Sequence, residues 1–545
     1  MSDVLMDERA TADVLKDKNI AGVGTVKPLA EPEVLRAAQE WLGGWYIVDH
    51  SACGNADLPA TRGDTWGFVN GRAAWQEKNF VYGNGDVWAD DFMSSSDHYA
   101  ASNLPAGFDG VDSVVLGYIA SHGVTSGSTF TMSSGGTGHG GCTVKSTQMS
   151  FGQNDLRYMF FSTCQSVRNV NPGAVWFRTA KGVRAIFGYH TNIVDSDAYG
   201  KYFFENWKKT GAKTTDSFLD ASWRVSHDQS PVAAWFGPDM ATAETSRDNE
   251  EYFQLDAISG RSIAWSWYDA RTLDRGLQLS MAPIMTLQFG APRGPEGAAE
   301  LVAQLGSRQP VEIDETTLSG DNVCHRTRDG AVLIYNTRSG SIDLTFPAFS
   351  SPSIVDFSDD EAVTAATEYV RGREEAFRGL KVDVANTDVA VVASDVRHSM
   401  VASADESGNS TDPRVKHVTV VFRQTVDGIA TIGTGGVIEV TLNGDREVCR
   451  VRSVLREVVS VARQDSAFDV AALQQRAEER ALAEVLAQPY VNEGRVLKTE
   501  FGFFSADESI VQSTAEPSFR VLVEMQTGPF ARIIEKIYPA QELAG

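Results

Sequence analysis

Two reactive side chains, His122 and Cys164, each follow a short apolar segment of the chain. The first segment, 114–120, reads VVLGYIA, and the second, 156–161, reads LRYMFF. Short apolar runs bounded by turn residues favour strands buried on both faces, as in a parallel sheet covered by helices. Ligands of such sheets bind beyond the carboxyl ends of the strands. We therefore expect His122 and Cys164 to project from strand ends towards one cleft.

This pair of residue types suits nucleophilic catalysis. A cysteine thiol has an ordinary pKa of about 8.5, so it is mostly protonated at neutral pH unless a base or a positive charge lies near it. His122 would supply that charge and later protonate a leaving amine. Gly123 would let a substrate approach the backbone, and its N–H could face a developing oxyanion. Either side chain alone is more often a core residue, but the two together indicate a nucleophile and its base.

The residues around this pair resemble the caspase-like (clan CD) superfamily of cysteine peptidases. Two segments show this resemblance: residues 119–123, which read IASHG, and residues 160–164, which read FFSTC. A third apolar segment over 183–189, with helical patterns after it, is similar to the order in that group. The resemblance implies an α/β three-layer sandwich with a mostly parallel sheet. It also implies an endopeptidase with Cys164 as nucleophile and His122 as general acid and base.

Two further segments narrow the resemblance to one family. Residues 81–92 and 188–191 are similar to a bacterial domain-of-unknown-function family, the one numbered 6345. The resemblance covers about residues 40 to 240, which is under half of the chain.

Four residues near the expected strand ends are candidates for substrate binding. Thr163 stands where the superfamily often has Ala, and it is small enough to be tolerated. Tyr189 and His190 end the third apolar segment and would shape a specificity pocket. Asp195 could bind a basic substrate side chain, although the capping of a helix near Ala198 is the favoured role. No residue is assigned to select the side chain before the cut, so the cleavage preference stays open.

Rival sites lie in the Gly-rich segment 125–153, which we interpret as a flap over the cleft. His139 and Cys142 form a second candidate dyad, but glycine-flanked loops position side chains poorly. The stretch 136–141 matches the dinucleotide fingerprint without the required strand and helix around it. Nothing in the spacing supports a metal site from these residues together with the main pair, and no loop has a defined calcium spacing. We expect no cofactor, and calcium activation has no support from the sequence.

Composition limits the class of partner. The chain has 545 residues, a formal net charge of −24 and 42% hydrophobic residues, as expected for a globular protein with several domains. The negative charge disfavours nucleic acid and anionic lipid surfaces and favours a cationic or neutral partner. The resemblance implies that this partner is a peptide or protein substrate. The five cysteines are scattered and odd in number, which does not indicate a disulfide framework. The sequence has no pattern of a signal peptide and no long apolar run, so we expect a cytoplasmic protein with no membrane span. Leaderless export stays open, and the oligomeric state is unknown.

Changes of pattern along the chain predict four regions. Residues 1–40 form an N-terminal arm with a helix from 33, and 41–240 form the peptidase domain, which ends in an acidic stretch over 238–251. Residues 241–354 form a β-rich connection in which 269–271 is turn material. Residues 355–545 form two α+β units, each a helix (360–377 and 470–486) followed by strands. These units resemble cystatin-like or PepSY-type modules, which implies a regulatory or binding role, including the holding of the enzyme as a zymogen.

Two other functions remain open from the sequence. One is a non-catalytic binding or scaffold protein with a caspase-like core. The other is a peptide-maturation transpeptidase that uses the same dyad, in which an amine replaces water as the second nucleophile.

Overall fold

A computed structural model describes residues 27–28, 41–71, 79–93, 110–209, 212–273, 280–292, 296–305, 313–319, 321–377 and 387–544. The expected N-terminal arm and the helix from residue 33 lie almost entirely outside these residues. Within them, none of the helices is long and apolar enough to span a membrane.

Five short parallel strands begin the fold, and all but β3 are strongly buried. Their order in the sheet is β3 (Phe80–Gly83), β2 (Leu42–Tyr46), β4 (Leu116–Ala120), β8 (Tyr158–Ser162) and β9 (Ala185–Tyr189). The sheet continues past residue 240, because β10 (Pro231–Gly237) and then β11 (Ser262–Thr272) are added antiparallel. The expected mixed α/β architecture with a parallel sheet is therefore confirmed for this part of the chain.

Helices cover one face of the parallel strands. They are α3 (Thr61–Gly71), α6 (Tyr199–Trp207) and α7 (Thr214–Val225). Phe68 of α3 and Phe203 of α6 pack on Phe160 of β8, so an aromatic layer joins helices and sheet. The sheet curls round this layer, since Val421 and Val437 from the second half of the chain belong to the same core. Burial of such side chains stabilises each by about 1.5–3 kcal/mol.

Small elements cover the other face. They are η3 (Ala89–Phe92), β5 (Gly123–Ser126), β6 (Thr129–Ser133), β7 (Thr143–Lys145) and α5 (Gly173–Trp176). The expected flap thus contains a three-stranded antiparallel sheet. The turn η3 begins after Trp88, whose N–H donates to Asp91 at 3.2 Å. The remaining short turns are η1 (Ser51–Cys53), η2 (Asn84–Asp86), η4 (Gly110–Ser113), η5 (Ser146–Gln148) and η6 (Pro347–Ser350).

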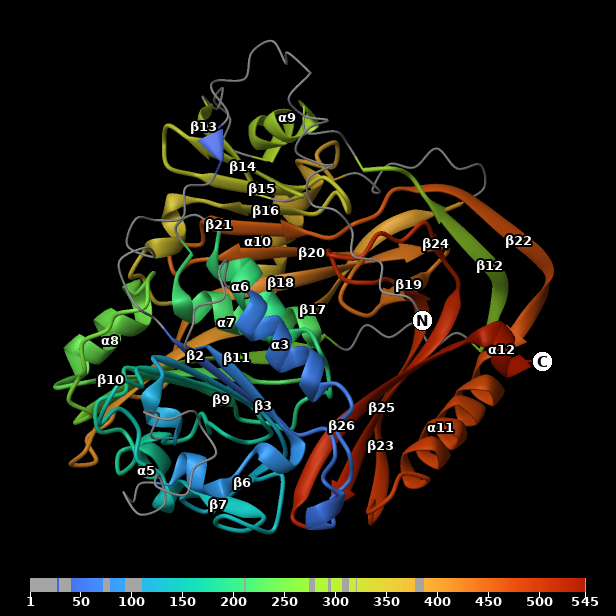
Figure 1. Cartoon of the computed structure of the whole chain (residues 1–545). Coiled ribbons are helices and arrows are strands. Elements are labelled where there is room, and N and C mark those ends of the chain that lie inside the picture. The colour runs from blue at the N-terminus through green and yellow to red at the C-terminus, as the bar shows by residue number, and fades with distance from the viewer. Residues whose placement is uncertain are drawn as a thin grey trace.

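The second half of the chain extends the same sheet (Figure 1). The added strands, in order, are β17 (Val389–Asp405), β18 (Arg414–Val426), β20 (Val437–Leu442), β21 (Val448–Ser453), β16 (Ile342–Thr345), β15 (Val332–Asn336), β14 (Asn322–Thr327), β13 (Ile313–Ser319) and β1 (Lys27–Pro28). Helices α9 (Glu296–Leu305) and α10 (Asp359–Arg371) contribute to its core.

Three local expectations in this half are corrected. Residues 269–271 are not a turn, because they lie inside β11 and pair with β17. The acidic stretch after residue 238 forms helix α8 (Met240–Asn249), whose first turn is capped by Asp239 accepting from the Thr242 amide at 2.7 Å. Helix α10 ends at Arg371, six residues early, and Gly372 is its C-cap.

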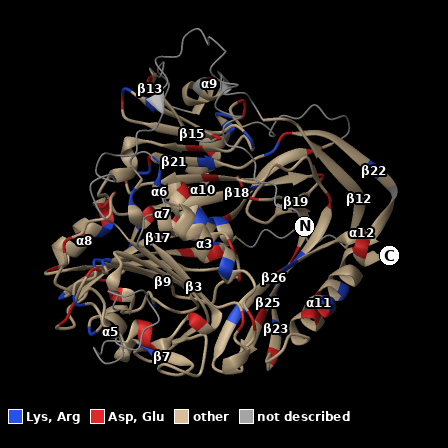
Figure 2. Cartoon of the chain, viewed as in Figure 1, with Lys and Arg blue, Asp and Glu red and all other residues tan. Residues whose placement is uncertain are grey.

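The C-terminal region contains a helix and a curved antiparallel sheet. Helix α11 (Val470–Leu486) begins and ends as expected, and packs across β23 (Glu493–Phe504) and β25 (Pro517–Thr527). The remaining elements are β26 (Phe530–Pro539), α12 (Ala540–Ala544), β19 (Ile429–Ile432), β12 (Met281–Phe289), β22 (Val458–Asp469) and β24 (Thr514–Ala515). Figure 1 shows the red hairpin β25–β26 reaching the blue and cyan N-terminal domain, and in Figure 2 α11 carries charges of both signs.

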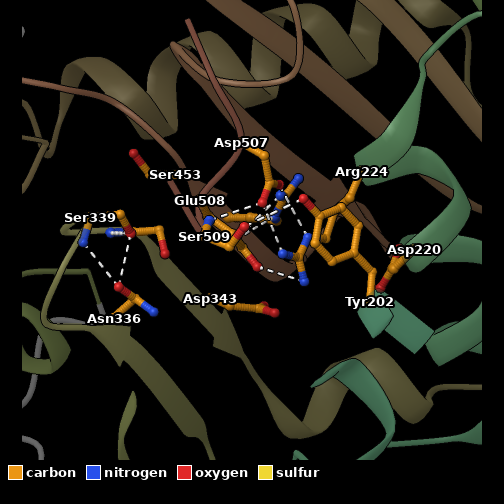
Figure 3. Close-up of polar contacts among 12 residues, drawn as sticks. Tyr202, Asp220, Arg224, Asn336, Ser339, Asp343, Ser453, Asp507, Glu508 and Ser509 are labelled. Atoms are coloured by element: carbon orange, nitrogen blue, oxygen red, sulfur yellow. Dashed lines mark hydrogen bonds and ion pairs between the residues drawn. The ribbon is translucent and has the colours of Figure 1, made fainter. Parts of the chain in front are cut away.

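Buried ion pairs attach the C-terminal region to helix α7 (Figure 3). Arg224 of α7 donates two hydrogen bonds to Asp507, at 3.0 and 3.2 Å, and pairs with Glu508 at 3.1 Å. Its guanidinium also lies over the Tyr202 ring, 3.8 Å from the centroid. The Arg224 side chain is only 3% exposed. Charges taken out of water in this way must be paired, so the contact is specific for these partners.

A disulfide joins two loops of the N-terminal domain. It links Cys53, beside α3, to Cys142 in the flap. The expectation that the cysteines form no disulfide is therefore wrong for this pair, because sequence spacing does not show that the two loops meet. Cys164, Cys324 and Cys449 are buried and are not part of a disulfide in this structure.

The Arg224 contact predicts a large loss of stability on truncation. Arg224→Ala leaves Asp507 buried without its hydrogen bonds, so we expect a loss of roughly 3–5 kcal/mol. In the matched control, Arg480→Ala, the pairs with Glu484 and Glu542 are half exposed, and a change below about 1 kcal/mol is expected. Urea unfolding followed by tryptophan fluorescence measures both. Equal effects in the two variants would contradict this account.

The disulfide predicts a redox-dependent melting temperature. A bond that closes a loop of this length (sequence separation 89) stabilises the folded chain by roughly 4 kcal/mol. Reductant should lower the melting temperature of the wild-type chain. The double variant Cys53→Ser, Cys142→Ser should start lower and show no response, and scanning calorimetry with and without dithiothreitol makes the comparison. A wild-type chain indifferent to reductant would show that the bond is not formed.

Candidate active site

The predicted pair lies at the ends of two neighbouring strands. Ala120 at the end of β4 is paired with Ser162 at the end of β8, and His122 and Cys164 follow two residues later on each strand. Both side chains are fully buried. An added Cβ on Gly123 would lie 2.8 Å from the Cys164 carbonyl oxygen, which shows how closely the two strand ends approach. The structure thus brings His122, Gly123, Thr163 and Cys164 together, as expected.

A backbone carbonyl fixes the tautomer of His122. Its Nε2 lies 2.8 Å from the carbonyl oxygen of Ala56. A carbonyl only accepts, so Nε2 carries the proton and Nδ1 carries the lone pair. Nδ1 is buried and has no hydrogen-bond partner among the described residues. Burial lowers the pKa of His122 to about 4, so the ring is neutral at pH 7 and its basic nitrogen is not engaged.

The loop that carries Ala56 is held from two sides. The Ala56 amide donates to Thr527 Oγ1 at 2.8 Å, and the disulfide of Cys53 lies three residues before it. The tilted ring of His50 lies 4.6 Å from that of His122 and packs against it. The Ala56 carbonyl, which orients His122, is therefore positioned by the disulfide and by the end of β25 in the C-terminal hairpin.

The surroundings of Cys164 favour the protonated thiol. Its Sγ accepts a hydrogen bond from the Ile193 amide at 3.4 Å. Burial raises the pKa of the Cys164 thiol, while the positive charge of Arg532 acts in the opposite direction. The thiolate, which is the nucleophile, is thus disfavoured at neutral pH. A neutral thiol beside a neutral imidazole is a resting arrangement.

An arginine from the C-terminal region fills the space beside Cys164. Arg532 of β26 is fully buried and donates to the Ser162 carbonyl at 3.3 Å and to Asp195 Oδ1 at 3.4 Å. Two residues earlier, Phe530 stacks on His122 with ring centroids 5.6 Å apart. One end of the hairpin β25–β26 thus covers both members of the pair.

Asp195 does not have the role favoured from the sequence, which was the capping of a helix near Ala198. The N-cap of α6 is Ala198, with no side-chain cap, so Asp195 does not cap this helix. Instead its carboxylate binds the Ala60 amide at 3.2 Å through Oδ2 and Arg532 through Oδ1. Asp195 thus contacts a basic side chain of the same chain, and the binding of a basic substrate side chain stays a prediction.

Tyr189 and His190, the other two candidates for substrate binding, lie in different surroundings. The Tyr189 ring is buried on the Asp195 side of the pair, with its hydroxyl 2.9 Å from Ser222 Oγ, and burial is the largest cause that raises its pKa. His190 faces another way: its Nδ1 accepts from the Asn169 amide at 3.4 Å. Burial lowers the pKa of His190, and the positive charge of Arg168 lowers it as well. Neither His190 nor Arg168 belongs to the Cys164 site.

The rival dyad is excluded by the disulfide. Cys142 is bonded to Cys53, and His139 stacks on Trp88 with ring centroids 3.5 Å apart. Within the described ranges, no group of three metal-ligating side chains lies together. A cavity of about 1070 Å³ is lined by residues such as Thr191, His227 and Lys498, but neither Cys164 nor His122 lines it.

Three contributors to the site were not predicted. The Ala56 carbonyl leaves no sequence signal, because any residue type supplies one. Asp64 is a fully buried acid inside α3, and an acid within an apolar helical pattern is the signal that would have marked it. Arg532 comes from a strand 337 residues beyond Asp195, so no local pattern connects them.

Comparison with known proteins supports the narrower resemblance. Residues 44–268 match the family model described as a domain of unknown function, DUF6345. This range holds β2 to most of β11, including His122, Cys164 and Asp195. The predicted relation to that family is confirmed over this part of the chain.

Other comparisons add little. No curated protein matches the chain. Among solved structures, the crystal structure of an uncharacterized protein from Eubacterium rectale ATCC 33656 is similar at 10% sequence identity and a TM-score of 0.29. The alignment covers 48% of this chain and 84% of that chain.

The burial of Cys164 predicts slow, alkaline alkylation in the resting chain. Because the thiol pKa is raised, the thiolate fraction at pH 7 is small and increases only as the pH rises beyond the ordinary cysteine value of about 8.5. Intact-mass kinetics with limiting iodoacetamide between pH 6 and 10, with Cys164→Ala to assign the site, measure this. Rapid single-site labelling at pH 6–7 would instead show an exposed thiolate.

Proposed function

We propose that the N-terminal domain is a cysteine endopeptidase of the caspase-like type. Cys164 is its nucleophile and His122 its general acid and base. The order β3-β2-β4-β8-β9, all parallel, followed by antiparallel β10 and covered on both faces, supports this type of sandwich. The placement of the two reactive residues on adjacent carboxyl ends supports it further.

The position of His122, together with its tautomer, carries the proposal. A buried unpaired ring nitrogen costs about 1–3 kcal/mol, and among the described residues Nε2 of His50, His227 and His325 shares this state with Nδ1 of His122. His122 differs from these histidines because its strand ends next to the strand that leads to Cys164. His122 fixes Nε2–H on the Ala56 carbonyl and leaves Nδ1 unpaired among the described residues, on the strand end next to that of the thiol. An unpaired base beside a nucleophile is the expected arrangement of a catalytic pair.

The proposed reaction has two steps. Sγ of Cys164 loses its proton to Nδ1 of His122 and attacks the peptide carbonyl carbon, which forms a tetrahedral oxyanion. Collapse breaks the C–N bond, and His122 returns the proton to the leaving amine, so that a thioester on Cys164 remains. Water, deprotonated by His122, then attacks the thioester and releases the acid product and the thiol.

Gly123 is suited to bind the oxyanion. It follows His122 directly, and an added Cβ would lie 2.8 Å from the Cys164 carbonyl and 3.0 Å from Cβ of Thr163. Only glycine fits without displacing the backbone that carries the nucleophile. Its N–H is the proposed donor, and loss of one such donor costs about 10²–10³ in kcat in other enzymes.

One observation favours a non-catalytic alternative. His122 and Cys164 are both inaccessible, and the C-terminal hairpin of the same chain covers them. If this cover never opens, the domain is a scaffold with a vestigial dyad. If it opens, the closed form is a zymogen-like resting state.

A hydrolysis assay with a loosened cover tests the proposal. Phe530→Ala removes the ring stacked on His122, so this variant should cleave a fluorogenic peptide library faster than the wild-type chain. In the Phe530→Ala background, Cys164→Ala should abolish cleavage and His122→Ala should lower it by about 10²–10⁴-fold. The matched control is Cys449→Ala, which removes a buried thiol far from the dyad and should leave the rate unchanged.

The outcomes separate the candidate functions. Cleavage that survives Cys164→Ala, or its absence from every loosened variant, would overturn the peptidase. Addition of a primary amine distinguishes the transpeptidase, because the product mass then includes the amine in place of water.

A further inference from the structure

The N-terminal domain alone supplies the acidic side chains of the pocket beside Cys164. Asp195 is held by the Ala60 amide at 3.2 Å. Asp64 accepts from the Tyr118 hydroxyl and from the Gly200 amide, both at 2.8 Å. All of these partners belong to the N-terminal domain. Two buried carboxyl groups are therefore fixed in place by this domain, independently of the residue that occupies the pocket.

Two buried acids favour a cationic occupant. Burial raises the pKa of Asp64 to about 6 and that of Asp195 above its ordinary value, and the charge of Arg532 lowers both. A nearby cation stabilises the ionised form of a buried carboxyl group. The planar guanidinium of Arg532 supplies such a charge and donates to Asp195 Oδ1 at 3.4 Å.

The segment around Arg532 lies along the site as an extended peptide. The Ile533 amide donates to the Ile193 carbonyl at 3.0 Å, and the Asp195 amide donates to the Ile533 carbonyl at 2.9 Å. These two bonds make a parallel bridge between Val194 and Ile533. Addition of a strand through main-chain bonds, with a side chain in a pocket, is how many proteins bind extended peptides.

Arg532 is nevertheless loosely held. Its two hydrogen bonds measure 3.3 and 3.4 Å, whereas charge-assisted bonds are usually about 2.7–2.9 Å. Its Nε is buried with no hydrogen-bond partner among the described residues. A side chain with suboptimal contacts can be displaced by one that fits better.

From these observations we propose that the pocket of Asp64 and Asp195 is a guanidinium-binding specificity pocket, and that Arg532 occupies it in the resting chain. The inference rests on the proposed function and names its substrate class: peptides with arginine on the amino side of the cut bond. The hairpin β25–β26 closes the site by presenting a side chain of the same chemistry as the substrate.

Peptidyl acyloxymethyl ketones ending in arginine, norleucine or aspartate test the pocket. These probes alkylate the active cysteine, and intact mass counts the labels. In the wild-type chain all three should react slowly. In Arg532→Ala, or Arg532→Gln if the first variant folds poorly, the arginine probe should label Cys164 at least about tenfold faster than the norleucine probe.

Two further variants make the test specific. Arg520→Ala removes another buried arginine of the same hairpin, paired with Asp228 and Glu500, but leaves Arg532 in the pocket. It should not produce the preference for arginine. Adding Asp195→Asn to Arg532→Ala should abolish the preference. Equal labelling by the arginine and norleucine probes in Arg532→Ala would overturn the proposal.

Binding of ethylguanidine separates this inference from the proposed function. It should raise the melting temperature of Arg532→Ala, and not that of Arg532→Ala with Asp195→Asn. If no probe labels Cys164 and no peptide is cleaved, the peptidase is wrong, yet a shift with ethylguanidine still establishes the cation pocket. If iodoacetamide labels Cys164 rapidly in Arg532→Ala but ethylguanidine gives no shift, the pocket is wrong and the peptidase stands.

Discussion

The register between β4 and β8 is the constraint on which the site depends. Both strands are buried on both faces, so a slip by one residue would turn every apolar side chain of one strand to the wrong face. It would also move Cys164 by about 3.3 Å relative to His122. The pairing of Ala120 with Ser162 therefore aligns Cys164 with His122 before any side-chain contact forms. The loops, the flap and the hairpin are arranged around this edge of the sheet.

The contact between the N-terminal domain and the C-terminal hairpin has an apolar and a polar part. The apolar part includes the cluster of Val194, Leu522 and Ile533, together with Ala56 and Leu58, which lie in the core of the C-terminal region. The polar part consists of buried ion pairs and main-chain bonds, such as those of Arg520 and Arg532. Buried charges contribute specificity more than net stability, because desolvation offsets much of their attraction. Such a contact closes in one geometry and yet stays open to competition from a ligand with matching charge.

Local patterns predicted the elements well and long-range contacts poorly. Helix α11 was predicted over its full length because apolar residues recur at helical spacing after Asp469, which caps it. The dyad was predicted because each reactive residue ends its own buried strand. Burial of Ala56 and Arg532 beside His122 and Cys164 depends instead on how distant segments meet. The turn expected over 269–271 failed for a similar reason, since pairing with β17 overrides the weak strand propensity of these polar residues.

The position of β11 bears on whether the part of the chain that matches the family can exist as a separate fragment. The matched family range ends at residue 268, within β11, while β11 pairs with β17 along its whole length, from Ser262 with Asp405 to Thr272 with Asp395. A fragment that stops at this boundary would leave a long strand with an unpaired edge, and with Trp265 and Trp267 no longer covered as in the intact chain. Exposed edges of this kind are templates for intermolecular pairing. The part of the chain that matches the family is thus not a separable unit, because its last strand requires a neighbour that the other half of the chain provides.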